Sequence, residues 1–237
     1  MRVIYIIITI SLIIFIISSY SYIKDFLERE KSRKWNNELM ENAIIEENLQ
    51  KSFEVDWQKI KNINQDIIGW IRIEKTNINY PILHDDNNLN YLNHSFNGEY
   101  NSNGSIFTLD RNPFMIEETT IYGHNMKNKS MFSELEKYMS EDFLKAHNTF
   151  ELYTKNQNYS ARIFSCYSTN VYEEQKNTAL LEFREKIEYY KKKSKHHVEN
   201  IGEVKKIIKL STCSYLNNHT NPTSERYYII ATIEPFK

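Results

Sequence analysis

The sequence predicts a mainly β domain with helical insertions, preceded by an N-terminal helical region. Three observations lead to this prediction. From about residue 68 onward, short segments alternate between apolar and polar residues, which is the spacing of half-buried strands. Clusters of Asn, Asp, Gly and Pro separate these segments and favour turns. The N-terminus instead carries a continuous apolar run, which is typical of a membrane-spanning helix.

Length and composition limit the possible functions. The 237 residues fit one domain of ordinary size with an appendage. With 30 basic and 31 acidic residues, the net charge of -1 gives no general attraction to nucleic acid, and no nucleic-acid partner is expected. The two cysteines, Cys166 and Cys213, are too few for a disulfide framework, so at least one thiol is free. Because no zinc-type spacing of Cys and His occurs, the sequence indicates neither a metal nor another cofactor.

The first segment, residues 1–24, is predicted to be a transmembrane signal-anchor. Val3 to Ile23 carries no charge and is long enough to cross a bilayer core, which needs about 20 residues. A cleaved signal peptide is the alternative, although its apolar part is usually only about 7 to 15 residues long. The charges that flank the run do not support an outward-facing C-terminal part. Arg2 alone precedes the run, whereas several Lys and Arg follow it. Counting positive charges would place the amino terminus outside.

Residues 25–62 are predicted to form a helical stalk and N-terminal helices. This region is highly charged and contains neither Gly nor Pro, which suits a solvated helix. Trp57, Ile60 and Ile63 recur at helical spacing near its end, so that part is expected to pack on the following domain. Residues 63–237 are assigned to the β domain.

Eight strands are expected in this domain. Such a number of short strands favours a closed barrel or a sandwich, because closure removes exposed strand edges. They cover residues 70–74, 78–83, 105–109, 119–122, 149–153, 159–169, 204–212 and 226–233.

Two helical insertions are predicted between the strands. The first covers about 131–146, with helix starts at Ser133 and Ser140. The second covers about 173–195 and would place apolar residues on one face, while its basic end suits a helix C-terminus. That apolar face comprises Leu180, Phe183, Ile187 and Tyr190.

Three polar residues at strand ends could supply acyl-transfer chemistry. A nucleophilic cysteine needs a base or cation and a group that stabilises the oxyanion. Cys213 ends the apolar strand IIKLSTC, His124 follows the strand TTIY, and Arg226 opens the last strand. Taken singly, each residue type at such a position is more often structural than catalytic.

Together, these segments resemble the sortase family. The motifs LSTC and YGHNM, followed by an Arg beyond the cysteine, occur in the order of the sortase signature. Further segments that resemble class B sortases are INQDIIGWIRIEKTNINYPIL, GSIFTLDRN and TTIYGHNMKNKSMFSELEKY, as does the long helical insertion before the seventh strand. The resemblance runs from about Ile63 to Ile233.

This resemblance implies a closed eight-stranded sortase-type β-barrel and a thiol transpeptidase without a cofactor. It implies Cys213 as nucleophile, His124 as general acid and base, and Arg226 as the residue that stabilises the oxyanion or holds the substrate. Residues near the bound peptide would be Asn88, Leu92 and Ser211, the first two within the segment 88–92.

The resemblance also implies partners and location. The enzyme would cleave a C-terminal sorting motif, NPxTN-like or PPxTG-like, after its Thr and join the protein to an amine of the peptidoglycan stem or crossbridge. The partners would then be surface proteins that carry such a signal, the peptidoglycan, and the membrane through the N-terminal anchor. The expected location is the cell membrane, single-pass, with an extracytoplasmic catalytic domain in a Gram-positive bacterium.

The sequence alone leaves alternative functions and site residues open. A cysteine peptidase releasing its product to water would use the same thiol and imidazole, and a non-enzymatic envelope protein would leave Cys213 buried and unreactive. His219 is a second candidate for the base. Cys166 is expected in the core, and Asp110 with Arg111 is interpreted as a turn-stabilising pair.

Overall fold

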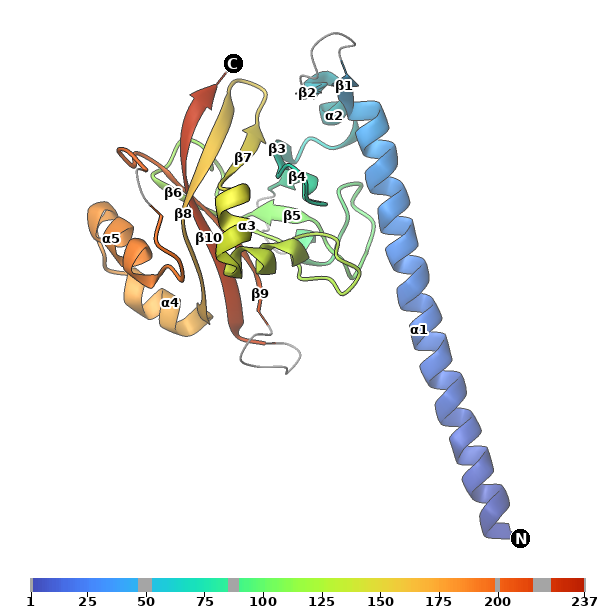
Figure 1. Cartoon of the computed structure of the whole chain (residues 1–237). Coiled ribbons are helices and arrows are strands. Elements are labelled where there is room, and N and C mark those ends of the chain that lie inside the picture. Colours follow the sequence, from blue (N-terminus) through green and yellow to red (C-terminus); the bar gives the residue numbers. More distant parts are fainter. Residues whose placement is uncertain (1, 47–52, 85–89, 199–200, 215–222, 237) are drawn as a thin grey trace. The chain divides into compact units, whose positions relative to one another are not determined.

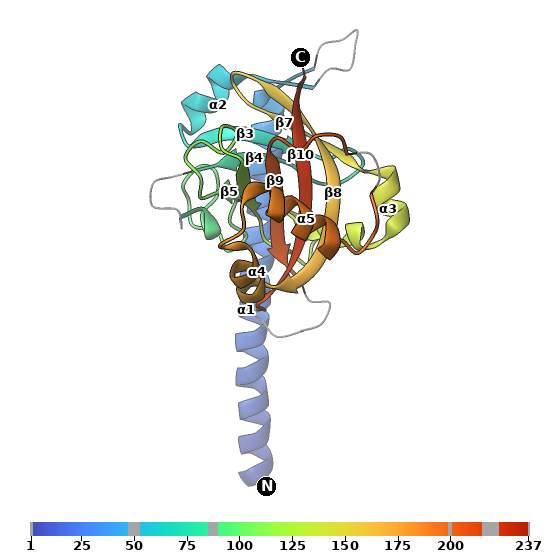
Figure 2. The same ribbon diagram turned by 90° about the vertical axis from the view of Figure 1, so that its left-hand side faces the viewer.

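A computed structural model describes residues 2–46, 53–84, 90–198, 201–214 and 223–236 (Figure 1). The chain divides into two compact units, residues 1–42 and 43–237, each described here by itself. The first unit lies within the long helix α1, Arg2–Ala43. The second contains the barrel and its insertions, seen from another side in Figure 2.

Helix α1 begins with the apolar run. Its most apolar window has a mean hydropathy of 2.5, and none of that window is buried. In the described part of the chain it is the one helix that is long and apolar enough to cross a membrane. A long apolar helix with no protein cover is stabilised by lipid, because water solvates its side chains poorly.

Two short strands separate α1 from the next helix in the region 25–62, where the sequence indicated helix. Strand β1 (Ile44–Glu46) pairs antiparallel with β2 (Phe53–Val55). Helix α2 then covers Trp57–Ile63 and buries Ile60. It begins after Asp56, whose carboxylate accepts a hydrogen bond from the Lys59 backbone N–H and so caps the helix. Aromatic and β-branched residues favour the extended backbone of the two strands.

The eight expected strands all form, and they close into a barrel rather than a sandwich. Their order around the barrel is β10-β8-β7-β3-β4-β5-β6-β9. The pairs β4–β5 and β6–β9 are parallel, and the other neighbouring pairs are antiparallel. The strands are β3 (Ile67–Arg72), β4 (Asn79–Leu83), β5 (Ile106–Thr108), β6 (Glu118–Tyr122), β7 (Thr149–Tyr153), β8 (Asn158–Asn170), β9 (Ile207–Cys213) and β10 (Glu225–Phe236).

Alternating side chains divide each strand between the barrel interior and its outer face. On β9, Ile208 and Leu210 belong to the interior core, whereas Ile207 belongs to a second cluster on the outside. Cys166 lies on β8 in the interior core and is fully buried, as expected. Burial raises the pKa of its thiol to about 11, so this thiol stays protonated at neutral pH.

The insertion expected at 131–146 forms in two parts. Residues Ser133–Met139 make the 3₁₀-helix η2, and α3 follows at Glu141–Ala146 after Ser140. Phe132, Leu135 and Tyr138 recur every third residue and are all fully buried. A 3₁₀-helix has three residues per turn, so it aligns these side chains on one face toward the core. The helix expected to start at Ser133 does begin there, but as a 3₁₀-helix with Phe132 as its N-cap.

The single helix expected at 173–195 is two helices, α4 (Val171–Thr178) and α5 (Phe183–Lys193). The break arises because Glu182 and Glu185 form a reciprocal capping box, which starts a new helix. Leu180, placed on the apolar face by its spacing, lies between the helices and is 93% exposed. Ile187 of that face is buried, as expected.

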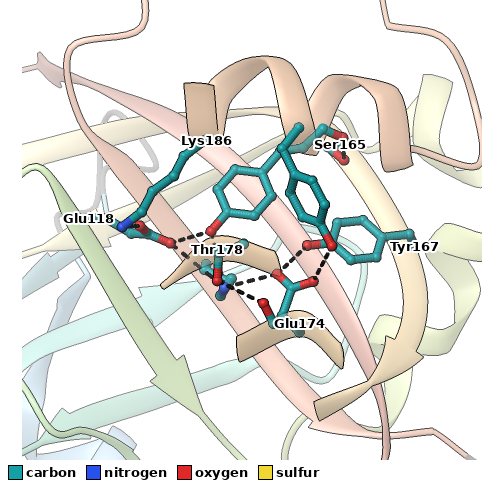
Figure 3. Close-up of polar contacts among 9 residues, drawn as sticks. Glu118, Ser165, Tyr167, Glu174, Thr178 and Lys186 are labelled. Atoms are coloured by element: carbon teal, nitrogen blue, oxygen red, sulfur yellow. Dashed lines mark hydrogen bonds and ion pairs between the residues drawn. The ribbon is translucent and has the colours of Figure 1, made fainter. Parts of the chain in front are cut away.

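Helix α5 packs on the outer face of the barrel wall through a cluster of aliphatic and tyrosine side chains. Beneath it lies a buried polar network centred on Lys209 of β9 (Figure 3). The Lys209 ammonium contacts Glu174 of α4 at 3.2 Å and Glu118 of β6 at 3.6 Å. Tyr167 donates to the Glu174 carboxylate at 2.7 Å, and Lys186 donates to Glu118 at 2.8 Å. Figure 3 shows both contacts as dashed lines. The network thus ties both helices to the wall.

The ionic balance of this network sets a pH dependence. Burial would raise the pKa of Glu118, but Lys209 and Lys186 outweigh burial and hold that pKa below its ordinary value of 4.5. A carboxylate with a lowered folded-state pKa stabilises the fold at neutral pH. This contribution is lost as the pH falls below 4.5 toward the folded-state pKa.

Lys209→Met is expected to lower the free energy of unfolding by about 3 kcal/mol, because it leaves the buried Glu174 carboxylate without its cation. Denaturant titration of the full chain in detergent, followed by tryptophan fluorescence, measures this change. The control Lys191→Met removes an ion pair with the exposed Glu188 and should leave the midpoint almost unchanged. Equal midpoints for the two variants would show that the network contributes no net stability.

Candidate active site

The register of three neighbouring strands brings the predicted catalytic residues together. Cys213 on β9 pairs directly with Arg226 on β10. On the other side of β9, Tyr122 of β6 pairs with Ser211 in parallel. Strand β6 ends at Tyr122, and His124 follows in the turn whose Gly123 N–H donates to the carbonyl of Ser211, two residues before Cys213. Segments distant in sequence therefore meet at one end of the barrel wall.

The Cys213 and Arg226 side chains share one face of the sheet. Because Leu210 points into the barrel core, alternation along β9 directs Cys213 to the outer face. Arg226 is the register partner of Cys213 and therefore lies on the same face. Cys213 is partly accessible, in contrast to the buried Cys166. A half-exposed thiol on an outer face can meet a peptide, which a core thiol cannot.

Gly123 permits the close approach on which this arrangement depends. Any Cβ at this position would lie 2.8 Å from the Phe132 ring and 2.4 Å from Ile106. Its backbone N–H donates to the Ser211 carbonyl, and the Phe132 N–H donates to the His124 carbonyl. The turn after β6 is thus held on both sides, and it fixes the position of the imidazole.

Asn125 adds a second connection between this turn and β9. Its side-chain amide donates to the Cys213 carbonyl at 2.8 Å. This Asn belongs to the motif YGHNM, but the motif alone did not predict its contact with the cysteine strand. A side chain that binds the backbone of the cysteine controls the spacing between the imidazole turn and the thiol strand.

The His124 ring is oriented by a backbone carbonyl. Its Nε2 lies 2.7 Å from the oxygen of Leu92, which is the last residue of η1 (Asn90–Leu92). A carbonyl oxygen only accepts hydrogen bonds, so this contact assigns the proton of the neutral ring to Nε2. Nδ1 then carries the free lone pair and can act as the base.

Arg226 is held by its own loop. Its Nη1 donates to the carbonyls of Thr223 and Glu225, at 2.5 and 2.8 Å. Among the residues that the structure describes, no carboxylate forms an ion pair with Arg226. The guanidinium is therefore fixed in position while its charge is not neutralised, and it can interact with a developing anion.

The residues predicted to contact the peptide lie in different settings. Leu92 is 44% exposed and adjoins the site through its carbonyl. Ser211 is on the outer face, two residues before Cys213, but only 3% exposed and within hydrogen-bonding reach of Tyr228. Asn88 and the alternative base His219 lie outside the described residues. Within the described ranges, no group of three His, Cys, Asp or Glu side chains could hold a metal ion.

Comparisons with known proteins identify relatives of this chain. The family model described as Sortase domain matches residues 71–234. The chain is 39% identical over 161 residues to Sortase B of Listeria monocytogenes, an alignment that covers 65% of each protein. It is 28% identical over 228 residues to Sortase B of Staphylococcus aureus, covering 93% of this chain and 92% of that one. The crystal structure of sortase B from B. anthracis in complex with AAEK1 superposes with a TM-score of 0.70 at 27% identity, covering 89% of this chain and 100% of that one.

Proposed function

Because this chain belongs to the sortase family, we propose that it is a cysteine transpeptidase that joins surface proteins to the cell wall. Its substrates would be proteins that carry a C-terminal sorting motif, NPxTN-like or PPxTG-like. The observation that carries this proposal is the strand register, which puts Cys213 between Arg226 and the His124 turn. Nucleophile, base and cation then surround a single peptide carbonyl.

In the first half of the reaction, the Cys213 thiol passes its proton to Nδ1 of His124. The thiolate attacks the carbonyl of the Thr in the sorting motif, and a tetrahedral oxyanion forms. His124 then returns the proton to the nitrogen of the departing peptide, so that the C–N bond breaks and a thioester remains. The Leu92 carbonyl supports this exchange by keeping the other ring nitrogen protonated.

In the second half, an amine of the peptidoglycan stem or crossbridge attacks the thioester. His124 accepts a proton from the attacking amine and delivers a proton to the departing Cys213 sulfur, which regenerates the thiol and forms an amide bond. Attack by water instead would give hydrolysis. Arg226, fixed by the Thr223 carbonyl, would stabilise the oxyanion in both halves.

We further propose that α1 anchors the enzyme in the cell membrane as a single span, with the barrel outside the cytoplasm. The support is the exposed apolar window of α1 together with the family relationship. The orientation follows from the substrate, because peptidoglycan amines are on the outer side of the membrane.

The decisive experiment separates transfer from hydrolysis. We expect the full chain in detergent micelles to convert a fluorescent peptide containing Asn-Pro-Ala-Thr-Asn or Pro-Pro-Ala-Thr-Gly into an amide product when an amine is added. Mass spectrometry would identify the ligated peptide, and its amount should rise with amine concentration. Product formation that is indifferent to the amine would indicate the peptidase alternative. A protein that turns over neither peptide and has an unreactive Cys213 would favour the binding-protein alternative.

A further inference from the structure

A cavity of about 450 Å³ lies on the outer face of β6, between this strand and α5. Tyr122 and Thr120 of β6 line one wall, and Phe183 and Lys186 of α5 line another. Since Tyr122 pairs with Ser211, the cavity begins one side-chain row away from Cys213. It therefore continues from the site of the proposed reaction rather than lying on a separate surface.

The lining combines an acidic interior with apolar edges. Glu118 is already paired with Lys186, which leaves the carboxylates of Asp110, Glu117 and Glu182. Apolar side chains add to the lining from both sides, namely Leu109, which is 42% exposed, and the half-buried Leu181 and Phe183. A long side chain with an apolar stem and a positive end matches such a lining.

Asp110 is the carboxylate best placed to receive that positive end. It is half-buried, and its carboxylate accepts a hydrogen bond from the Thr120 backbone. Within the described chain, no Lys or Arg forms an ion pair with it. Burial raises the pKa of Asp110, and the attraction of the nearby His84 only partly offsets this effect. A cationic ligand would supply an ion-pair partner.

The strand register gives the approximate distance between Cys213 and the part of the cavity next to Asp110. Thr120 pairs with Lys209, which is four residues before Cys213 on β9. Four residues of extended chain span about 13 Å. An extended peptide that runs alongside β6 from the thiol would reach Asp110 with the residue four positions away from its attacked carbonyl.

We propose that this cavity binds a Lys or Arg side chain of the sorting substrate, four residues N-terminal to the attacked Thr. This position immediately precedes the sorting pentapeptide. The N-terminal direction follows from the chemistry, because the acyl segment stays on the enzyme through both half-reactions and the C-terminal segment must leave. The inference rests on the proposed function and adds a specificity element outside the pentapeptide.

The test compares three peptides that share one sorting pentapeptide and carry Lys, Ala or Glu immediately before it. For the full chain in detergent, kcat/KM should fall in the order Lys, Ala, Glu, with about a fivefold ratio between Lys and Glu. In Asp110→Asn, this ratio should fall close to one. The control Glu141→Gln, which removes a carboxylate from the exposed Lys145 pair on α3, should keep the native ratio.

A binding measurement distinguishes failure of this inference from failure of the proposed function. Fluorescence anisotropy with Cys213→Ala reports peptide affinity without turnover. If Cys213→Ala binds the Lys and Glu peptides equally, or if Asp110→Asn in that background leaves their affinity ratio unchanged, the cavity is not the site of the basic residue. The native protein could instead turn over no peptide while the Asp110-dependent preference in binding persists. That result would support the cavity as the binding site of the basic residue and would refute the transpeptidase assignment.

Discussion

Cys213→Ala is expected to abolish thioester formation and to lower peptide turnover by about four orders of magnitude or more. The reason is that the variant lacks the only thiol that the described structure places on the outer face, as the register partner of Arg226. Intact-protein mass spectrometry would detect the acylated native enzyme when the amine is withheld. The same measurement on the variant should show the unmodified mass alone.

Cys166→Ala is the matched control, because it removes the other thiol of the chain. Cys166 is fully buried in the barrel core, and burial raises its pKa to about 11, so it offers neither access nor thiolate. This variant should keep native kinetics with a modest loss of stability from the smaller core side chain. If Cys213→Ala retained appreciable turnover, covalent catalysis by Cys213 would be refuted.

The barrel was predictable because local patterns specify its strands. On β9, Lys209 and Ser211 alternate with Ile208 and Leu210, and the interior core contains the two apolar residues of that alternation. The position of Cys213 at the end of β9 was also predictable from the sequence, because the apolar run stops there. Closure of the sheet, however, rests on the parallel pairing of β6 with β9, which is a long-range contact. Only the family resemblance decided between barrel and sandwich.

The parts that sequence did not predict are set by non-local contacts. The hydrogen bond from His124 to the Leu92 carbonyl uses a backbone atom, so side-chain identity at position 92 gives no signal for it. The contact from Asn125 to the Cys213 carbonyl joins the turn after β6 to strand β9, so it is also non-local and ends on a backbone atom. The break before α5 had a local signal in Glu182 and Glu185, but helical spacing across Leu180 concealed it.

Arg226→Lys is expected to lower kcat/KM by about two to three orders of magnitude while the barrel remains folded. Nη1 of Arg226 is occupied by the Thr223 and Glu225 carbonyls, and the planar guanidinium keeps further N–H donors in a fixed direction. An ammonium has one nitrogen, which can either bind these carbonyls or turn toward the oxyanion. Steady-state kinetics with the sorting peptide measures the loss, and Arg162→Lys, a change at an exposed position of β8, is the control.

The split between kcat and KM decides which task Arg226 performs. If it stabilises the oxyanion, kcat should fall with KM almost unchanged, because the interaction forms only in the transition state. If it holds the peptide before reaction, KM should rise with kcat almost unchanged. Arg226 is the register partner of Cys213, so the proposed mechanism would bring its guanidinium close to the attacked carbonyl, and we expect the first pattern. Near-native values of both constants would show that Arg226 has no role in catalysis or substrate binding. Backbone N–H groups would then have to stabilise the oxyanion.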